Sequence, residues 1–328
     1  MSDVVRAPSP AQPPTAPGAV AFSPTRLGFG CASLGSRVGA TAGLRALHAA
    51  HESGVEWFDV APAYGAGEAE TILSRFVKGR RDRILLTTKV GIAPPARLGA
   101  MRLAYAAGRP VVGALSGLRR AFRKVSATRN VHVPLTAELI ETSIAASLAR
   151  LGTDHVDVYA LHDPDPADVG RDEVLRALEN VMARGQARRV AVAGKRAACA
   201  AAARIGAPFG LLQMSVADLA AGEADFAGAG MARVVHSVFG VDGLKRRLET
   251  ALADPAKAAA LREAGYDGPA AAADLLIDCA FALNPNGVVL ASMFDERHRA
   301  RNLAGAARAV RPAALAALAK VMPGGLAS

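Results

Sequence analysis

Short runs of Val, Ile and Leu recur along the chain without a clean alternation of polar and apolar positions. Runs of this kind are typical of parallel β-strands that are covered on both faces. We therefore predict eight strands, at residues 25–31, 57–61, 83–90, 155–161, 187–193, 211–216, 232–239 and 287–293.

Longer segments rich in Ala, Leu and Arg lie between these runs and carry apolar residues at helical spacing. Segment 136–150 has the clearest ends, because Thr136 is a suitable N-cap, Glu138 and Glu141 lie in the first turns, and Gly152 follows. We predict helices at 41–53, 67–78, 136–150, 171–184, 195–205, 270–283 and 295–307, and a shorter or irregular one near 218–229.

Eight strands that alternate with helical segments favour a (β/α)8 TIM barrel over two separate α/β domains. Residues 1–22 are rich in Pro and Ala and lack the features of a signal peptide, so we expect a disordered tail. Residues 23–328 are then a single barrel domain. Two long βα loops, a basic insertion at 92–134 and a second at 240–269, are expected on the C-terminal face, where barrel active sites are built.

The net charge of +10 favours an anionic partner, which could be nucleic acid, an acidic membrane or a phosphate-bearing ligand. The aromatic content of 5% argues against a stacking surface for single-stranded nucleic acid. Arg, Asp and Gly interrupt the Ala-rich stretches well before the ~18 apolar residues that a membrane span needs. We therefore expect a soluble, cytoplasmic protein that binds neither nucleic acid nor a membrane.

The cysteines are far apart in the sequence, and no CxxC pair exists. This spacing predicts neither a disulfide framework nor a zinc site, and we expect no metal. The simplest interpretation is that each thiol is a small buried apolar group. The three residues are Cys31, Cys199 and Cys279.

Ionisable residues stand at the ends of three consecutive predicted strands. Asp59 ends the second strand, Lys89 the third and His162 the fourth, and Tyr64 follows in the loop after the second. Neighbouring parallel strands lie ~5 Å apart, so these side chains can converge on one pocket. Each residue alone is more often a salt bridge, a cap or a core residue than a catalytic group, but the joint arrangement favours catalysis.

These four residue types form a coherent acid–base site. A free tyrosine, with a pKa near ~10, is a poor acid or base at neutral pH, and a neighbouring ammonium group lowers that pKa. A carboxylate beside the lysine holds the ammonium group in place, and an imidazole can donate to a carbonyl oxygen. Such a site can protonate a developing alkoxide or remove the proton of an alcohol.

The segments FDVAPAYG, TTKVG and LHDPD resemble the catalytic segments of the aldo-keto reductases, and the resemblance extends from about Thr25 to Asn302. It is closest to bacterial members that act on sugars and other small carbonyls. The resemblance implies a nicotinamide cofactor along the top of the barrel and hydride transfer to a substrate carbonyl carbon. It also implies roles for the tetrad: an acid–base tyrosine, a lysine that lowers its pKa, an aspartate that supports the lysine, and a histidine that orients the carbonyl, at Tyr64, Lys89, Asp59 and His162.

The resemblance also implies cofactor contacts around the nicotinamide and the pyrophosphate. Gln213 stands where the family contacts the carboxamide of the nicotinamide. The Ser-Asn pair that the family usually has after strand five is missing, because the sequence there is Ala193-Gly194-Lys195. After strand seven, the segment with Ser237 and Phe239 resembles the loop that contacts the pyrophosphate.

The stretch from Ser292 to Asn302 resembles the adenosine-binding loop of the family, in which Asn302 matches the residue that contacts adenine. Arg301 replaces a family glutamate, and His298 replaces the usual basic residue that binds the 2′-phosphate. Arg297 or Arg301 could substitute for it, so NADP(H) is favoured while NAD(H) stays open. The alternative interpretation of this basic cluster is a solvated helix face.

The leading hypothesis is therefore an NAD(P)(H)-dependent oxidoreductase that interconverts a small aldehyde or ketone, with an aldose as one option, and its alcohol. Its partner is a small molecule, and a monomer is the default. A second hypothesis is a cofactor-binding barrel that acts as a non-catalytic sensor, which the missing Ser-Asn pair motivates and the intact tetrad opposes. A third is a binder of nucleic acid or anionic surfaces, but insertion 92–134 fits better as a lid that excludes water.

Overall fold

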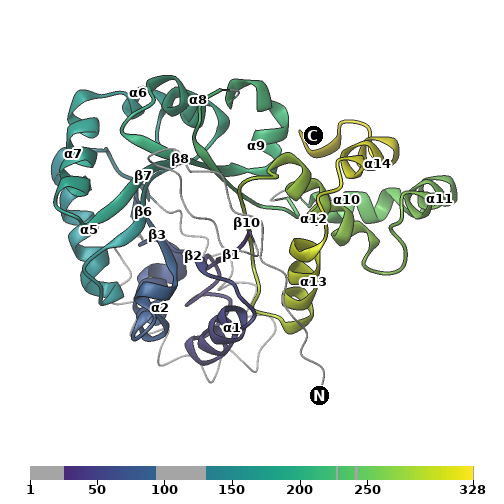
Figure 1. Cartoon of the computed structure of the whole chain (residues 1–328), viewed down its shortest axis with the longest axis horizontal. Helices are drawn as coiled ribbons and strands as arrows, with labels where there is room; N and C mark the ends of the chain where they lie inside the picture. The colour runs from purple at the N-terminus through teal and green to yellow at the C-terminus, as the bar shows by residue number, and fades with distance from the viewer. Residues whose placement is uncertain (1–25, 94–130, 227, 241–242, 328) are drawn as a thin grey trace, which may run out of the picture.

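The computed structural model of the chain describes residues 26–93, 131–226, 228–240 and 243–327. Its centre is a closed barrel of parallel strands in the order β1-β10-β9-β8-β7-β6-β3-β2 (Figure 1). The predicted (β/α)8 barrel is therefore confirmed. The strands are β1 (Leu27–Gly30), β2 (Trp57–Asp59), β3 (Leu85–Val90), β6 (Val156–His162), β7 (Ala187–Ala193), β8 (Phe209–Ser215), β9 (Ala232–His236) and β10 (Val288–Ala291).

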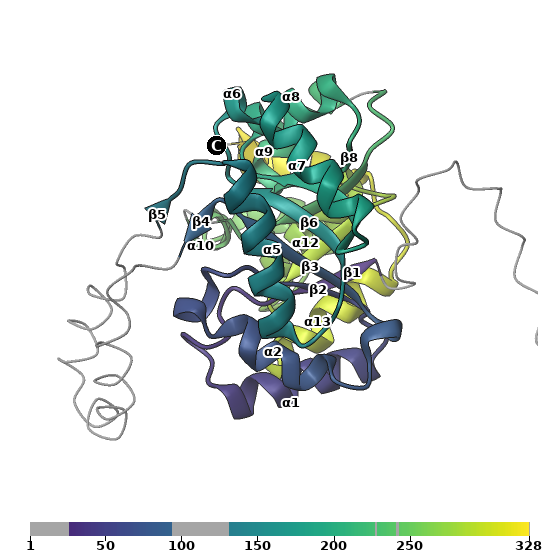
Figure 2. The same cartoon turned by 90° about the vertical axis from the view of Figure 1, so that its left-hand side faces the viewer.

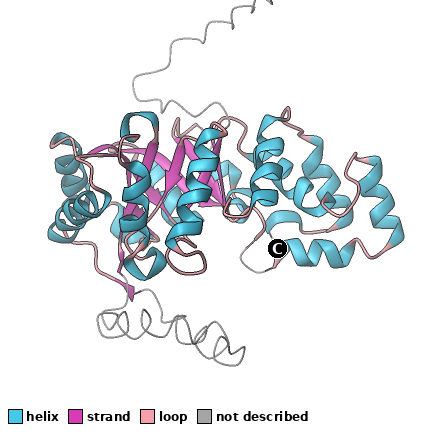
Figure 3. Ribbon diagram, turned by 90° about the horizontal axis from the view of Figure 1, so that it is seen from below, coloured by secondary structure: helices cyan, strands magenta, loops and turns pink. Residues whose placement is uncertain are grey.

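Helices surround these strands and cover the outside of the barrel (Figure 3). The N-terminal and central ones are α1 (Ala40–Glu52), α2 (Ala69–Val77), α5 (Ala137–Leu151), α6 (Pro166–Val169), α7 (Asp172–Ala183), α8 (Arg196–Ile205) and α9 (Val216–Ala221). The later ones are α10 (Leu244–Ala251), α11 (Pro255–Glu263), α12 (Ala271–Leu283), α13 (Glu296–Ala307) and α14 (Ala313–Val321). In Figure 1, α10, α11 and α14 lie to one side of the barrel.

The predicted ends of α5 agree with the structure. The Thr136 side chain accepts a hydrogen bond of 3.1 Å from the backbone N–H of Leu139, which satisfies one of the free amides of the first turn. Gly152 ends the helix in the left-handed conformation, with φ of 67°. Its buried face includes Ile140 and Ile144, which belong to the large apolar core between the barrel and the helices.

A second, smaller apolar cluster fills the inside of the barrel. Trp57 of β2, Val158 of β6 and Leu211 of β8 are among its members, and each is almost completely buried. This filling leaves the barrel closed, so a ligand can approach only from an end. Trp57 is therefore a packing residue of this inner cluster.

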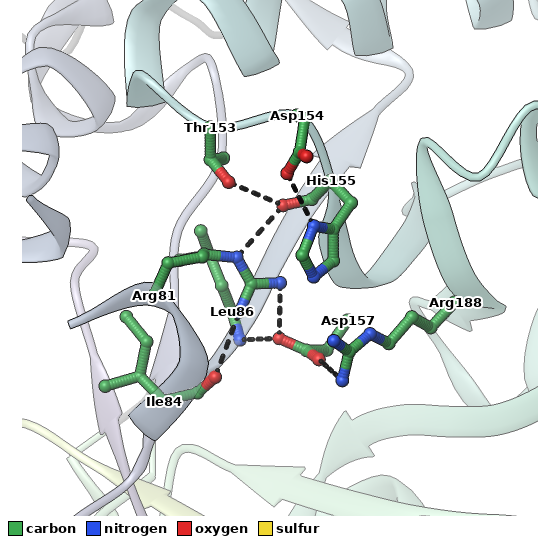
Figure 4. A network of polar contacts seen from close by, with 8 residues as sticks. All are labelled: Arg81, Ile84, Leu86, Thr153, Asp154, His155, Asp157 and Arg188. Carbon is green, nitrogen blue, oxygen red and sulfur yellow. Dashed lines mark hydrogen bonds and ion pairs between the residues drawn. The ribbon is translucent and has the colours of Figure 1, made fainter. Parts of the chain in front are cut away.

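The polar face at the amino ends of β3 and β6 is held by the buried carboxylate of Asp157 (Figure 4). Its oxygens accept from the backbone N–H of Leu86 at 2.8 Å, pair with Arg81 at 2.8 Å and pair with Arg188 at 3.2 Å. Arg81 also donates from Nε to the carbonyl of His155 at 3.1 Å. This network joins the start of β3, the start of β6 and the start of β7 at the face opposite to the carboxyl ends of the strands.

Several elements differ from the sequence-based expectation. Segment 240–269, expected to be a long loop, contains the helices α10 and α11, and α14 was not predicted. At the ends of insertion 92–134, β4 (Ile92–Ala93) and β5 (Val131–His132) form an antiparallel pair that projects beyond the barrel (Figure 2). Residues 94–130 of this insertion, which include its basic cluster, and the tail 1–22 lie outside the described residues.

The three cysteines are free and buried, as the sequence predicted. Burial raises the pKa of each thiol, so all three are held in the neutral form. Within the described part of the chain, none of the helices has the length and apolar content to cross a membrane.

Candidate active site

Three ionisable residues meet at the carboxyl ends of adjacent barrel strands. Asp59 is the last residue of β2, Lys89 is the last but one of β3, and His162 is the last of β6. The strands β2, β3 and β6 are neighbours in the barrel, so their ends open onto the same face. In barrels of this kind, that face carries the active site.

Tyr64 joins this group from the turn that follows β2, the short 3-10 helix η1 (Tyr64–Gly67). Gly65 has φ of 60°, and a Cβ at this position would overlap the carbonyl oxygen of Leu34, so glycine is required here. The turn directs Tyr64 over the strand ends. Its ring lies edge-on to that of His162, with 5.8 Å between the ring centroids.

The ammonium group of Lys89 is the centre of the hydrogen-bond network. Its Nζ donates to Asp59 Oδ1 at 2.5 Å, to the carbonyl of Val60 at 3.1 Å and to the Tyr64 hydroxyl at 3.4 Å. The second oxygen of Asp59 accepts from Gln213 Nε2 at 3.1 Å. Since Lys89 is only 1% exposed, this charge is compensated by the protein rather than by water.

The protonation states of this network follow from burial and charge. Burial raises the pKa of Tyr64 more than the Lys89 ammonium lowers it, so the pKa of Tyr64 lies above its ordinary value. Lys89 does lower this pKa, as the resemblance implies, but its contribution is smaller than the effect of burial. Burial alone would lower the pKa of Lys89. Asp59 and Tyr64 raise it by more than burial lowers it, so the pKa lies above its ordinary value and the ammonium form is kept.

His162 is neutral over the physiological range. Burial, followed by the positive charge of Lys89 and by His236 and His132, lowers the pKa of His162 to about 3. Its Nδ1 is buried, and within the described chain no hydrogen-bond partner reaches it. A neutral imidazole carries one N–H donor, which can polarise a carbonyl oxygen without giving up a proton.

A cavity of about 730 Å³ opens directly above these side chains. Its wall includes Asp59, Tyr64, Lys89 and His162. Four predicted cofactor residues are also part of the wall: Gln213, Ser237, Phe239 and Ser292. Gln213 is 3% exposed, and its Oε1 has no partner among the described residues. A buried amide oxygen without a partner fits a ligand with an N–H donor, such as the carboxamide of a nicotinamide.

The predicted adenosine residues lie on α13, outside this cavity. The N-terminus of α13 is capped by Asp295, whose carboxylate accepts from the backbone N–H groups of Arg297 and His298. The Nε of Arg301 is 4.0 Å from Asp274, and Asn302 is 2% exposed with an unpartnered Nδ2 in the described structure. The structure thus places His298, Arg301 and Asn302 on the helix that follows β10, and separates them from the cavity itself.

Three further residues of the cavity wall had no assigned role in the sequence. Arg37 comes from the loop after β1, Lys195 from the loop after β7, and His236 from the end of β9. His236 Nδ1 lies 2.9 Å from Ser237 Oγ, and burial lowers the pKa of this imidazole. Lys195 and His236 fall in segments that resemblance marks as cofactor-binding, whereas no sequence signal marks Arg37.

The family of this chain follows from its sequence match. The model of the aldo/keto reductase family matches residues 26–241, which is about two thirds of the chain. The chain therefore belongs to the aldo/keto reductase family. The match includes the tetrad and Gln213, and it ends before α13.

Curated relatives match over shorter stretches. The 6-dehydroglucose reductase of Agrobacterium fabrum is 33% identical over 46% of this chain and 42% of its own length. The D-threo-aldose 1-dehydrogenase of a Pseudomonas species is 32% identical over 51% of this chain and 49% of its own length. The chain thus matches about half the length of these relatives.

Solved structures resemble the chain over nearly its full length. The holo form of an aldo-keto reductase from Bacillus halodurans superposes with a TM-score of 0.66 at 20% identity, covering 92% of this chain and 93% of that one. An aldo/keto reductase from Klebsiella pneumoniae in complex with NADP and acetate gives 0.61 at 19% identity, with 91% of each chain covered. At these identities the likeness concerns the fold.

Proposed function

We propose that this chain is an NAD(P)(H)-dependent oxidoreductase that interconverts a small aldehyde or ketone and its alcohol, with Tyr64 as the general acid and base. The observation that carries the proposal is the position of the Tyr64 hydroxyl, 3.4 Å from the buried Lys89 ammonium at the floor of a large cavity. Family membership supports it independently.

The protein groups have separable tasks in this reaction. In the direction of reduction, the Tyr64 hydroxyl donates its proton to the carbonyl oxygen, and the Lys89 ammonium stabilises the phenolate that remains. Asp59 keeps Lys89 charged and in place through the contact of 2.5 Å. The neutral His162 ring donates a hydrogen bond that orients the carbonyl. In oxidation, the same tyrosine accepts the alcohol proton.

A nicotinamide cofactor supplies the hydride when it is bound. Gln213 would hold the carboxamide, and Ser237, Phe239 and Ser292 lie along the rest of the cavity wall. NADP(H) is favoured by the basic residues of α13, and NAD(H) stays open. Among relatives, one from Escherichia coli is named an NADH-specific methylglyoxal reductase and is 32% identical over 34% of this chain and 28% of its own length.

Tyr64→Phe tests the proposed proton transfer, because it removes the hydroxyl and keeps the ring. We expect kcat for aldehyde reduction to fall by about 10²–10⁴-fold, the usual contribution of a general acid. Cofactor binding should persist, measured by titrating the protein separately with NADPH and NADH and following the quenching of Trp57 fluorescence. Single-turnover mixing of the preloaded enzyme with aldehyde measures the chemical step.

Tyr266→Phe is the matched control. Its hydroxyl donates to Asp278 at 2.9 Å, and the residue is not part of the cavity wall, so turnover should stay unchanged. Full turnover in Tyr64→Phe would show that another group moves the proton. Tight cofactor binding without turnover of any carbonyl compound in the wild type would favour the non-catalytic sensor. That alternative is motivated by the missing Ser-Asn pair, where this chain has Ala193-Gly194-Lys195.

A further inference from the structure

A second cavity, of about 490 Å³, adjoins the active-site cavity. The two share three wall residues, His162, Asp163 and Lys195, which therefore lie at the boundary between the cavities. The far wall of the second cavity includes His132 of β5 and Leu135. None of the sequence motifs assigns a ligand to this space.

Asp163 is held at the boundary of the two cavities in a strained conformation. Its φ of 49° is left-handed, a conformation that is uncommon outside glycine and that aspartate and asparagine adopt more readily than other residues. The backbone N–H of Asp163 donates to the carbonyl of Ala193 at 2.6 Å. Gly194 permits this approach, because a Cβ there would lie only 3.2 Å from the Asp163 Cα. Strain of this kind is typical of functional sites.

The carboxylate of Asp163 is left with capacity to accept hydrogen bonds. Its side chain is 32% exposed, and the His132 ring, whose Nε2 is 3.8 Å from Oδ2, lies beyond hydrogen-bond distance. Lys195, an exposed residue just before α8, has no carboxylate within 4.0 Å in the described part of the chain. The boundary therefore presents one charged acceptor and one charged donor with no net charge.

We propose that Asp163 and Lys195 bind the hydroxyl groups of an aldose whose carbonyl lies between Tyr64 and His162. This inference rests on the proposed function and adds a specificity site to it. A hydroxyl can donate to the carboxylate and accept from the ammonium group, so a neutral polyhydroxylated chain satisfies both. An alkyl chain offers neither group a hydrogen bond.

Asp163→Gly tests this site, because glycine keeps the left-handed backbone and removes only the carboxylate. The substrates are D-erythrose and butanal, which have the same carbon number and differ in hydroxyl groups. A hydrogen bond to a charged group contributes about 1.5–3 kcal/mol, so kcat/KM for D-erythrose should fall about 10–100-fold, mainly through KM. The kcat/KM for butanal should remain within about threefold of the wild-type value.

Asp163→Asn is the second variant, because asparagine tolerates the same backbone conformation and keeps one acceptor oxygen. Its kcat/KM for D-erythrose should fall by less than that of Asp163→Gly, and its kcat/KM for butanal should not change. Lys195→Met should lower kcat/KM for D-erythrose by a larger factor than kcat/KM for butanal. Equal losses with both substrates, or no loss with either, would overturn the specificity site and leave the carbonyl reductase intact. Failure of the wild type to reduce either aldehyde with either cofactor would overturn both proposals.

Discussion

The buried charge of Lys89 decides how Tyr64 behaves as an acid. A tyrosine in this position without the ammonium group would have an even higher pKa, since burial is the largest influence on it. Lys89 can exert its effect only because Asp59 neutralises the cost of burying it, at 2.5 Å. The three residues therefore act as one unit, and the net result is a tyrosine that is protonated, and thus ready to donate, at neutral pH.

The direction of these shifts predicts the pH dependence of reduction. The pKa of Tyr64 is raised, so the acid form persists throughout the neutral range, and the pKa of His162 is about 3, so its neutral form dominates well below pH 5. We expect kcat/KM for aldehyde reduction to be flat from about pH 5 to about pH 9 and to decline only as Tyr64 loses its proton.

The measurement is a pH profile taken with saturating cofactor and a non-ionisable aldehyde such as butanal. Tyr64→Phe provides the control, since its residual rate should show no alkaline decline. A break near pH 6.5, the ordinary pKa of a histidine, would show that His162 titrates in this range and would contradict the assigned neutral form.

The sequence was informative about the tetrad because its members occupy fixed positions at the ends of apolar strands. Asp59 and Lys89 could be placed together from strand order alone, without knowledge of side-chain conformations. The opposite holds for Asp163 and Arg37. Their positions depend on backbone turns with φ values that residue type does not specify, such as the 49° of Asp163. The net direction of the pKa shift of Tyr64 could not be predicted from the sequence either, because it depends on the balance of burial and charge.

At the scale of the element, strands were easier to predict than the later helices. A buried parallel strand carries a compact run of apolar residues, and all eight predicted runs are barrel strands in the structure. In contrast, α11 buries only Leu261, so its sequence lacks an apolar stripe that distinguishes it from a loop. Its start was nevertheless marked, since Asp254 caps the helix and Pro255 occupies its first turn.

Asp157 provides a test of what holds β3, β6 and β7 together. Asp157→Asn removes the charge that pairs with Arg81 at 2.8 Å and leaves that arginine, whose side chain is 13% exposed, without a counter-ion. We expect the free energy of unfolding to fall by about 2–3 kcal/mol, measured by urea denaturation. Catalytic turnover per folded molecule should not change, because the network lies at the barrel end opposite to the cavity.

Glu249→Gln is the matched control for this carboxylate-to-amide change. Glu249 pairs with Lys245 at 2.9 Å, but the two side chains are 47% and 40% exposed, so the loss should be at most about 0.5 kcal/mol. Equal losses in the two variants would mean that burial of Asp157 contributes nothing. A loss of turnover in Asp157→Asn would show that the two ends of the barrel are coupled.

At the scale of the whole molecule, the C-terminal helices pack against one another and onto the barrel. Helix α14 contacts α11 and α12, and the short helix η4 (Gly325–Ala327) contacts α9. Asp278 of α12 joins them further, accepting from Arg308 at 2.9 Å and from Tyr266 at 2.9 Å. This packing is consistent with a single domain over residues 23–328, which stays a prediction.

The single domain can be tested with the only tryptophan of the chain. Trp57 is 1% exposed inside the barrel, and Leu318, equally buried, lies in α14 on the far side of the core helices. Leu318→Ala deletes buried methyl groups and should lower the free energy of unfolding by about 2–5 kcal/mol. If barrel and C-terminal helices unfold as one cooperative unit, the Trp57 fluorescence transition shifts to lower denaturant together with the far-UV circular dichroism transition.

Lys320→Ala, an exposed change in the same helix, should leave both transitions in place. An early loss of circular dichroism signal in Leu318→Ala, with an unmoved Trp57 transition, would contradict the single domain. The C-terminal helices would then be a separate folding unit, and α13, which carries Arg301 and Asn302, would depend on that unit for its position beside the barrel. Coincident fluorescence and circular dichroism transitions instead mean that α13 and the tetrad unfold in the same cooperative transition. Cofactor binding would then stabilise the whole barrel.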